Sequence, residues 1–228
     1  MSQIQTEYIF PCPIWWVDFN DLNDEELLRH CYDIEKKSPG RKMSNHGGYQ
    51  SNFLSVEDKR FSVLLDAVNE AGNFIYDNVY KRYCDVLKPG LLVDSYWMNI
   101  NRKNDLNMTH VHPGSVLSAV YYVKSVGSDE QGCITFEKNY NSVFIESSQF
   151  KIKPNTPTSF LSQECALPPI EGRLYLFPSS LPHHVSPNLM SNDRVSISFN
   201  LCSFDDYDLQ RFHDQIVEEQ KNNQWVMN

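Results

Sequence analysis

Long apolar runs are missing from this chain of 228 residues. No stretch approaches the roughly 18 apolar residues that a membrane-spanning helix needs. The N-terminus also lacks a basic segment followed by an apolar one, which is the pattern of a secretion signal. We therefore expect a protein without a membrane span, which is not secreted and acts in the cytoplasm.

An excess of positive charge is also missing, because the formal net charge is −9. Affinity for nucleic acid rests largely on lysine and arginine side chains that neutralise phosphates. This balance argues against a nucleic-acid partner and favours a protein, a peptide or a small molecule as substrate. It leaves the oligomeric state open, with a homodimer as one option.

Closely spaced cysteines are missing as well. The six cysteines form no C-x-x-C pair, so neither a zinc knuckle nor a dithiol redox motif is indicated. We expect buried free thiols in a reducing compartment.

The first part of the chain indicates an edge strand and then helices. The stretch "YIFPCPIWWVDF" is apolar but interrupted by two prolines, which suits an edge strand. The stretch "NDLNDEELLRHCYDIEKK" predicts a helix capped by Asn23 or Asp24, with acids in its first turn and lysines in its last. A second helix is predicted over residues 55–87, starting from a Ser-x-x-Asp capping signal at Ser55.

From Leu91 onward the hydrophobic period changes to two. Seven or eight short strand candidates follow, separated by Gly, Pro, Asn and Ser clusters, and they include "SVFIES" and "TSFLS". This spacing is typical of a β-sandwich or jelly roll with helices packed on one sheet. We expect one domain, with mainly helical support over 1–90, the β core over 91–203 and a helix over 204–228.

Two histidines one residue apart, His110 and His112, stand at the head of the strand candidate "SVLSAVYYV". On an extended chain such residues share a face about 6.5 Å apart, so both can reach one ion. The other histidine pair beside a strand is His183 and His184, where a turn over Pro178 to Pro182 would aim His183 across the sandwich. An HxH pair that only packs on one strand face remains the alternative.

Arg194 begins an alternating strand in which Ser196 shares its face. A buried unpaired charge costs several kcal/mol, whereas the guanidinium fork binds a carboxylate through two hydrogen bonds. The sequence favours the carboxylate of a small diacid as the partner of Arg194. An internal salt bridge or an outward orientation is the alternative.

The order of these motifs resembles the Fe(II)- and 2-oxoglutarate-dependent oxygenases. The motifs are "HVHPGSVLSAVYYV" and "LFPSSLPHHVSPN...RVSISFNL", with "IFPCPIW", "HGGYQSNFLS" and "WMNI" in support. Within that superfamily the chain is similar to a group of bacterial and marine-virus oxygenases that share an HxHP-x-S signature. The resemblance implies a mainly β fold with some α-helix, the double-stranded β-helix (jelly roll). It also suggests that a virus could encode the chain, which would then act in the host cytoplasm.

The resemblance also implies the site and the reaction. Fe(II) is expected on His110, His112 and His183, with His112 in the place where most of the superfamily has an aspartate. The cosubstrate 2-oxoglutarate is expected on Arg194, Ser196, Tyr122 and Asn99. No catalytic side chain beyond the metal centre is expected. The implied reaction is hydroxylation with O2, releasing succinate and CO2.

Other interpretations stay open. His112 could be the first metal ligand, with Gly114 at the position of the carboxylate ligand. The coordination position would then be open to a halide, as in related halogenases. A cupin-type metalloprotein would also use three histidines, although the first cupin motif fails here. A jelly roll that binds a partner without turnover is the alternative of a different class.

Overall fold

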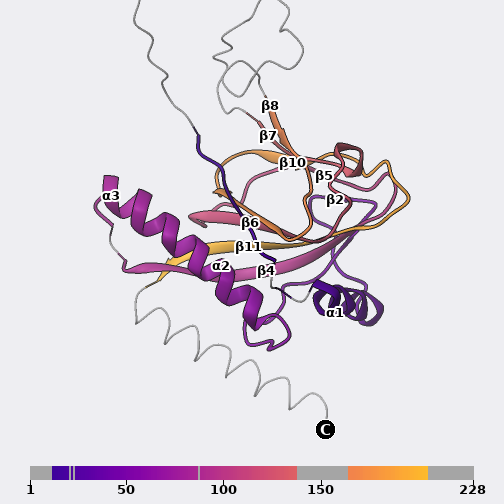
Figure 1. Cartoon of the computed structure of the whole chain (residues 1–228), viewed down its shortest axis with the longest axis horizontal. Coiled ribbons are helices and arrows are strands. Elements are labelled where there is room, and N and C mark those ends of the chain that lie inside the picture. Colours follow the sequence, from indigo (N-terminus) through magenta and orange to yellow (C-terminus); the bar gives the residue numbers. More distant parts are fainter. Residues whose placement is uncertain (1–11, 21, 23, 87, 138–163, 205–228) are drawn as a thin grey trace, which may run out of the picture.

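The strands of the computed structural model form two antiparallel sheets, which lie one above the other (Figure 1). The structure describes all residues except 1–11, 21, 23, 87, 138–163 and 205–228. Sheet A has the order β1-β9-β6-β11-β4-β3 and sheet B the order β2-β5-β10-β7-β8. The strands of sheet A are β1 (Trp15–Asp18), β3 (Tyr49–Gln50), β4 (Gly90–Asn101), β6 (Leu117–Lys124), β9 (Arg173–Pro178) and β11 (Arg194–Phe204). Those of sheet B are β2 (Asn45–His46), β5 (Leu106–His110), β7 (Ile134–Glu137), β8 (Glu164–Leu167) and β10 (His183–Val185).

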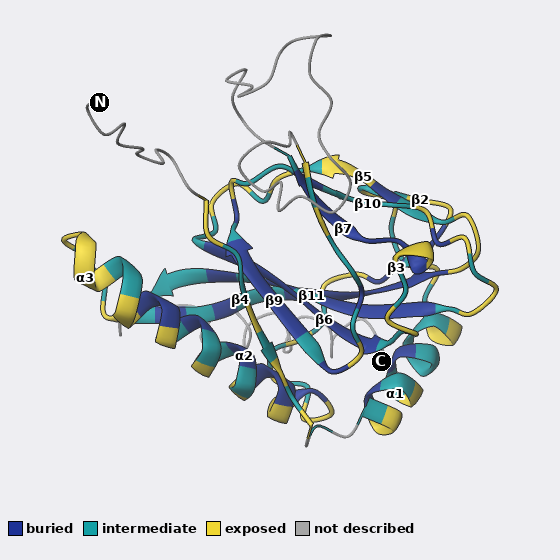
Figure 2. Ribbon diagram, turned by 45° about the horizontal axis from the view of Figure 1, so that its top comes forward, coloured by how far each residue is buried: buried dark blue, intermediate teal, exposed yellow. Residues whose placement is uncertain are grey.

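Strand β11 lies in the middle of sheet A and separates two environments. Its residues Val195, Ile197, Phe199 and Leu201 are fully buried in the main hydrophobic core. The alternate residues Arg194, Ser196 and Ser198 line a pocket on the other face. Because successive side chains of a strand point to opposite faces, one face of β11 stabilises the fold and the other faces sheet B. Figure 2 shows the buried strands of sheet A between the helices and sheet B.

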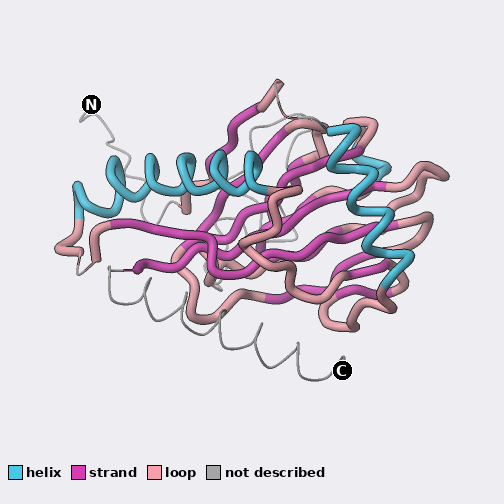
Figure 3. Tube along the Cα trace, turned by 90° about the horizontal axis from the view of Figure 1, so that it is seen from below, coloured by secondary structure: helices cyan, strands magenta, loops and turns pink. Residues whose placement is uncertain are grey.

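Helices cover the face of sheet A that is turned away from the pocket, as the sequence predicted (Figure 3). Helix α1 (Asp24–Lys37) packs on β6 and helix α2 (Ser62–Ile75) on β4. The first turn of α1 is acidic and its last turn is basic, which complements the helix dipole. A π-helical turn η1 (Tyr76–Tyr80), a short α3 (Lys81–Tyr83) and a 3-10 turn η2 (Asp129–Gln131) complete the described elements. No helix among the described residues is long and apolar enough to cross a membrane.

The predicted start of the second helix is wrong. Residues from Ser55 form turns, in which the Ser55 carbonyl accepts from the Asp58 N–H at 3.0 Å. The Asp58 carboxylate binds the Arg60 guanidinium, with a shortest distance of 2.5 Å. The helix therefore begins only at Ser62. A capping signal in the sequence does not show whether a nearby arginine will occupy the carboxylate.

The predicted strands of sheet A and β7 are confirmed, and the stretch around β1 does form an edge strand. Five strands were not predicted: β2, β3, β5, β8 and β10. Each of them has five residues or fewer, and a strand so short leaves little alternation to recognise. The candidates "SVFIES" and "TSFLS" and the helix expected over 204–228 lie outside the described residues.

Candidate metal centre and carboxylate pocket

Three histidines converge at one end of the pocket between the two sheets. His110 ends β5 and His183 begins β10, and these two residues are direct cross-strand partners. His112 follows β5 after one residue. The ring centroids lie 4.9 Å apart for His110 and His112, 4.4 Å for His110 and His183, and 5.2 Å for His112 and His183. One ring nitrogen from each lies within 4.8 Å of the others, so the three can hold one metal ion.

Backbone carbonyls select the nitrogen that two of these rings offer. The Nδ1 atoms of His110 and His183 lie 2.7 Å and 2.9 Å from the carbonyl oxygens of Met108 and Leu181. A carbonyl oxygen can only accept a hydrogen bond, so each Nδ1 carries the proton and donates it. The lone pair is then on Nε2, which is the arrangement that metal-binding histidines use.

Burial keeps the three imidazoles neutral. It lowers the pKa of His110, and it lowers the pKa of His112 to about 3 and that of His183 to about 4. The neighbouring histidines add to this effect on His112 and His183 because each disfavours a second positive charge. At neutral pH all three therefore have a lone pair available for a metal.

His184, the neighbour of His183, lies on the opposite face of sheet B. Its Nδ1 is 2.8 Å from Oε1 of Glu137, and the same oxygen accepts from the Thr109 hydroxyl at 2.7 Å. These residues line a separate, open depression. The alternation of β10 thus brings His183, and not His184, to the histidine cluster.

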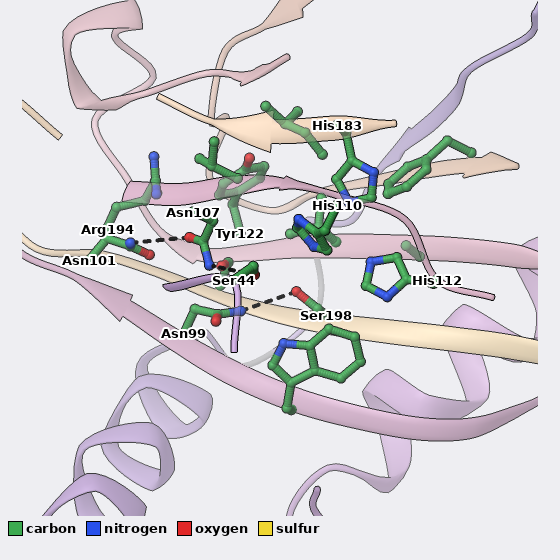
Figure 4. Close-up of a pocket in the computed structure, with 17 residues that line it drawn as sticks. Ser44, Asn99, Asn101, Asn107, His110, His112, Tyr122, His183, Arg194 and Ser198 are labelled. Atoms are coloured by element: carbon green, nitrogen blue, oxygen red, sulfur yellow. Dashed lines mark hydrogen bonds between the residues drawn. The ribbon is translucent and has the colours of Figure 1, made fainter. Parts of the chain in front are cut away.

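Arg194 occupies the other end of the pocket (Figure 4). Its side chain is 1% exposed. Nη1 donates to the carbonyl oxygens of Gln131 and Gly132 at 2.8 Å and 2.6 Å. No carboxylate among the described residues forms an ion pair with Arg194, and burial lowers its pKa. The guanidinium is thus a buried cation with two neutral partners, which suits an anion that enters the pocket.

Gly132 makes the space that Arg194 occupies. Its φ of 89° is in the left-handed region that favours glycine. A Cβ built at this position would clash with Nη1 of Arg194 and with the Ser186 carbonyl oxygen. The close approach of the Gly132 backbone therefore fixes the guanidinium.

All seven residues that the sequence singled out line this one pocket. Ser196 and Asn99 are cross-strand partners on β11 and β4, and Tyr122 is paired with Ser196 from β6. The Asn99 side-chain amide donates to the Ser198 hydroxyl at 3.2 Å. The sequence reasoning therefore found residues from both ends of the pocket.

Other pocket residues were missed as functional candidates: Ser44, Trp97, Asn101, Asn107 and Ser198. The amide of Asn101 donates to Asn107 at 3.3 Å, and that of Asn107 donates to Ser44 at 3.4 Å (Figure 4). Alternation in "WMNIN" places Trp97, Asn99 and Asn101 on one face, and this signal could have found two of the missed residues. No local signal brings Ser44 or Asn107 to them.

The prediction that His110 and His112 stand at the head of the strand "SVLSAVYYV" is wrong. His110 ends its own strand in sheet B, and β6 starts only at Leu117 in sheet A. The turn between them includes Gly114 with a φ of 92°. The N–H of His112 donates to the Ser179 carbonyl at 2.9 Å. That hydrogen bond, and not strand alternation, holds His112 at the cluster.

Comparison with known families agrees with this arrangement. Residues 95–200 match the family model described as "Putative 2OG-Fe(II) oxygenase". This region of the chain is similar to the 2OG-Fe(II) oxygenases. The matched region includes all three clustered histidines and Arg194. The cofactors of this family are Fe(II) and 2-oxoglutarate.

Solved structures share the fold of this chain. A prolyl-4-hydroxylase from Pseudomonas putida has a TM-score of 0.57 and 13% identity, over 85% of this chain and 94% of that one. The epimerase SnoN from nogalamycin biosynthesis has a TM-score of 0.61 and 12% identity, over 84% and 79%. HygX from Streptomyces hygroscopicus, with nickel and 2-oxoglutarate bound, has a TM-score of 0.54 and 13% identity, over 84% and 83%. A search of curated proteins finds no match.

Proposed function

We propose that this chain is an Fe(II)- and 2-oxoglutarate-dependent dioxygenase that hydroxylates a protein side chain or a small molecule and releases succinate and CO2. The observation that carries the proposal is the composition of one pocket. Three neutral histidines stand at one end, and at the other stands a buried arginine that has no carboxylate partner among the described residues. The family requires both a metal and a diacid, and this pocket offers a group for each.

His110, His112 and His183 would hold Fe(II), each through one ring nitrogen. Arg194 would bind the far carboxylate of 2-oxoglutarate, with hydroxyl groups of Ser196 and Tyr122 beside it. Bound iron and 2-oxoglutarate together supply the oxidising power by activating dioxygen. Asn99 would orient the cosubstrate from the strand next to Ser196.

The chain also has a means to exclude water from this chemistry. Part of the pocket wall is apolar and buried, and it consists of Val120 and Phe177 from sheet A and Ile134 from sheet B. Phe177 packs against His183 with ring centroids 4.7 Å apart. A dry wall strengthens the attraction between Arg194 and a carboxylate.

The third histidine distinguishes this site from the 2-His-1-carboxylate triad of non-haem Fe(II) oxygenases. A neutral imidazole in place of a carboxylate leaves the metal with its full charge of two plus. We expect this to tighten the binding of anionic 2-oxoglutarate and to shift the redox potential. His110 lies in the cluster with His112 and His183. This favours His110 as a metal ligand over the alternative in which His112 is the first ligand and Gly114 stands at the carboxylate position.

Anaerobic titration tests the proposal directly. Fe(II) and 2-oxoglutarate added to the wild-type protein should produce the weak visible band of a keto acid chelated to Fe(II). Under O2 the same sample should form succinate slowly, even without the primary substrate. The absence of both the band and any 2-oxoglutarate affinity would refute the assignment. Binding without succinate formation would favour the non-catalytic jelly roll, and metal binding without 2-oxoglutarate affinity would favour the cupin-type protein.

A further inference from the structure

A second arginine, Arg41, lies beside the pocket that holds the three histidines, and it forms no ion pair with the described residues. The Arg41 N–H donates to the Gln50 carbonyl at 2.8 Å, which holds this residue next to β3. The guanidinium carbon lies 3.8 Å from the ring centroid of Phe53 and 5.7 Å from that of Trp97. The two rings meet edge to face with centroids 5.8 Å apart. We call Arg41, Phe53 and Trp97 the cationic rim.

Trp97 connects the cationic rim to the histidine cluster. It lines the metal pocket, and its ring centroid is 5.5 Å from that of His112. A molecule that reaches the metal past Trp97 can therefore extend to Arg41. The rim thus adjoins the pocket at His112. Arg194 lies at the other end of the pocket from His112 (Figure 4).

The guanidinium of Arg41 has no counterion among the residues that the structure describes. Three other arginines, Arg60, Arg102 and Arg173, bind the carboxylates of Asp58, Glu35 and Asp18. No such pair involves Arg41 within the described part of the chain, and its Nε atom is buried without a hydrogen-bond partner. Burial lowers the pKa of Arg41. A cation in this state gains most from an anion that arrives from outside.

Stacking on the rings does not by itself explain this arrangement. The Phe53 side chain stays 57% exposed, so Arg41 does not bury it. A cation held over an exposed ring contributes only about 0.5–1 kcal/mol. The rim thus presents an apolar surface and a positive charge together at the edge of the pocket.

Two buried hydrogen-bond acceptors lie on the strands next to the rim. Oε1 of Gln50 and Oδ1 of Asn99 find no donor within the described part of the chain, and these residues are cross-strand partners on β3 and β4. Carboxylates and keto groups of 2-oxoglutarate cannot donate to them. A ligand that also has N–H groups would satisfy these oxygens.

We propose that the cationic rim binds the primary substrate of the oxygenase through a carboxylate on Arg41, and that this substrate is an amino acid or the carboxy-terminal residue of a peptide. The inference rests on the proposed function. The aliphatic part of the ligand packs along Phe53 and Trp97, which directs its side chain to the metal. N–H groups of the same ligand donate to Gln50 and Asn99.

Matched acids and amides test this inference. Nickel-loaded protein saturated with 2-oxoglutarate is titrated with free amino acids, with N-acetyl amino acids and with tripeptides, each as the acid and as its carboxy-terminal amide. We expect at least one acid to bind tenfold or more tighter than its amide. Free amino acids and peptides form separate arms, so the same series distinguishes these two sources of the carboxylate.

The variants Arg41→Gln and Arg41→Lys complete the test. Arg41→Gln should reduce the preference for the acid below threefold, and Arg41→Lys should keep part of it. Both should bind 2-oxoglutarate as wild type does. Arg102→Gln, which removes an exposed arginine paired with Glu35, should keep the full preference. The inference is overturned if no acid is preferred over its amide, if nothing in the series binds, or if Arg41→Gln keeps the preference. Loss of 2-oxoglutarate binding by the wild type would instead refute the proposed function.

Discussion

Replacing Arg194 by methionine should separate 2-oxoglutarate binding from metal binding. The guanidinium is 1% exposed, donates to two backbone carbonyls and has no carboxylate partner among the described residues. Removing one partner of a buried, hydrogen-bonded charge pair costs about 2–5 kcal/mol. We therefore expect the 2-oxoglutarate dissociation constant of Arg194→Met to rise by about 30-fold or more.

The same change should have a smaller effect on stability. The variant no longer buries an unpaired cation, which saves several kcal/mol. It also leaves the carbonyl oxygens of Gln131 and Gly132 without this donor, at a cost of about 1–3 kcal/mol each. These contributions oppose each other, so we expect the free energy of unfolding without 2-oxoglutarate to change by less than about 2 kcal/mol.

Calorimetric titration with 2-oxoglutarate, cobalt titration and urea unfolding measure the three quantities. Arg102→Met is the matched control, because Arg102 is half exposed and binds Glu35 on the surface. Cobalt affinity should stay within about threefold of the wild type, since no histidine contacts change. A fall in 2-oxoglutarate affinity of less than tenfold, or an equal fall in cobalt affinity, would refute the role of Arg194.

Three further predictions concern the metal end and the glycine beside Arg194. His183→Ala should weaken cobalt binding more than about 100-fold, because losing even a residue that only orients a ligand lowers metal affinity 10–100-fold. His184→Ala should leave the cobalt affinity unchanged. Equal losses for the two variants in spectroscopic titrations would contradict the assignment. The free energy of unfolding of the metal-free protein should fall as pH is lowered from about 6.5 to 5. Burial lowers the pKa of His112 to about 3 and that of His183 to about 4, so the unfolded chain binds more protons in this range; urea titrations that show a flat or opposite trend would exclude this linkage. Gly132→Ala should destabilise the protein by at least about 1 kcal/mol and weaken 2-oxoglutarate binding, because a Cβ would displace Arg194. If thermal unfolding and 2-oxoglutarate titration of this variant match the wild type, the backbone adapts and the prediction is wrong.

The sequence was sufficient to predict features that rest on strong local patterns. Alternation in "RVSISFNL" identified both faces of β11, and with them the inward orientation of Arg194. The turn after β9 places His183 in the other sheet, opposite His110. These features depend on period and turn chemistry, which are written within a few residues.

Other features depend on partners far away in the chain. The strand β5 has the sequence LNMTH, which is too polar to predict a strand by itself, yet it pairs with both β2 and β10. Arg41 lies in the polar stretch "SPGRKMSNHGGYQSN", in which no pattern indicates what it contacts. Its position over Phe53 and Trp97 follows from the pairing of residues 49–50 with β4. Tertiary context decides such placements.

The pairing of His110 with His183 also bears on how the metal can be exchanged. These residues face each other across antiparallel strands, and β10 is paired on its other side with β7. The main-chain ladder, and not the ion, therefore fixes the two imidazoles. In small zinc domains the metal itself supplies the folding energy, so that removing it unfolds the chain. Here we expect a chelator to remove the metal from a folded protein, which can then be reloaded with iron, cobalt or nickel without a refolding step.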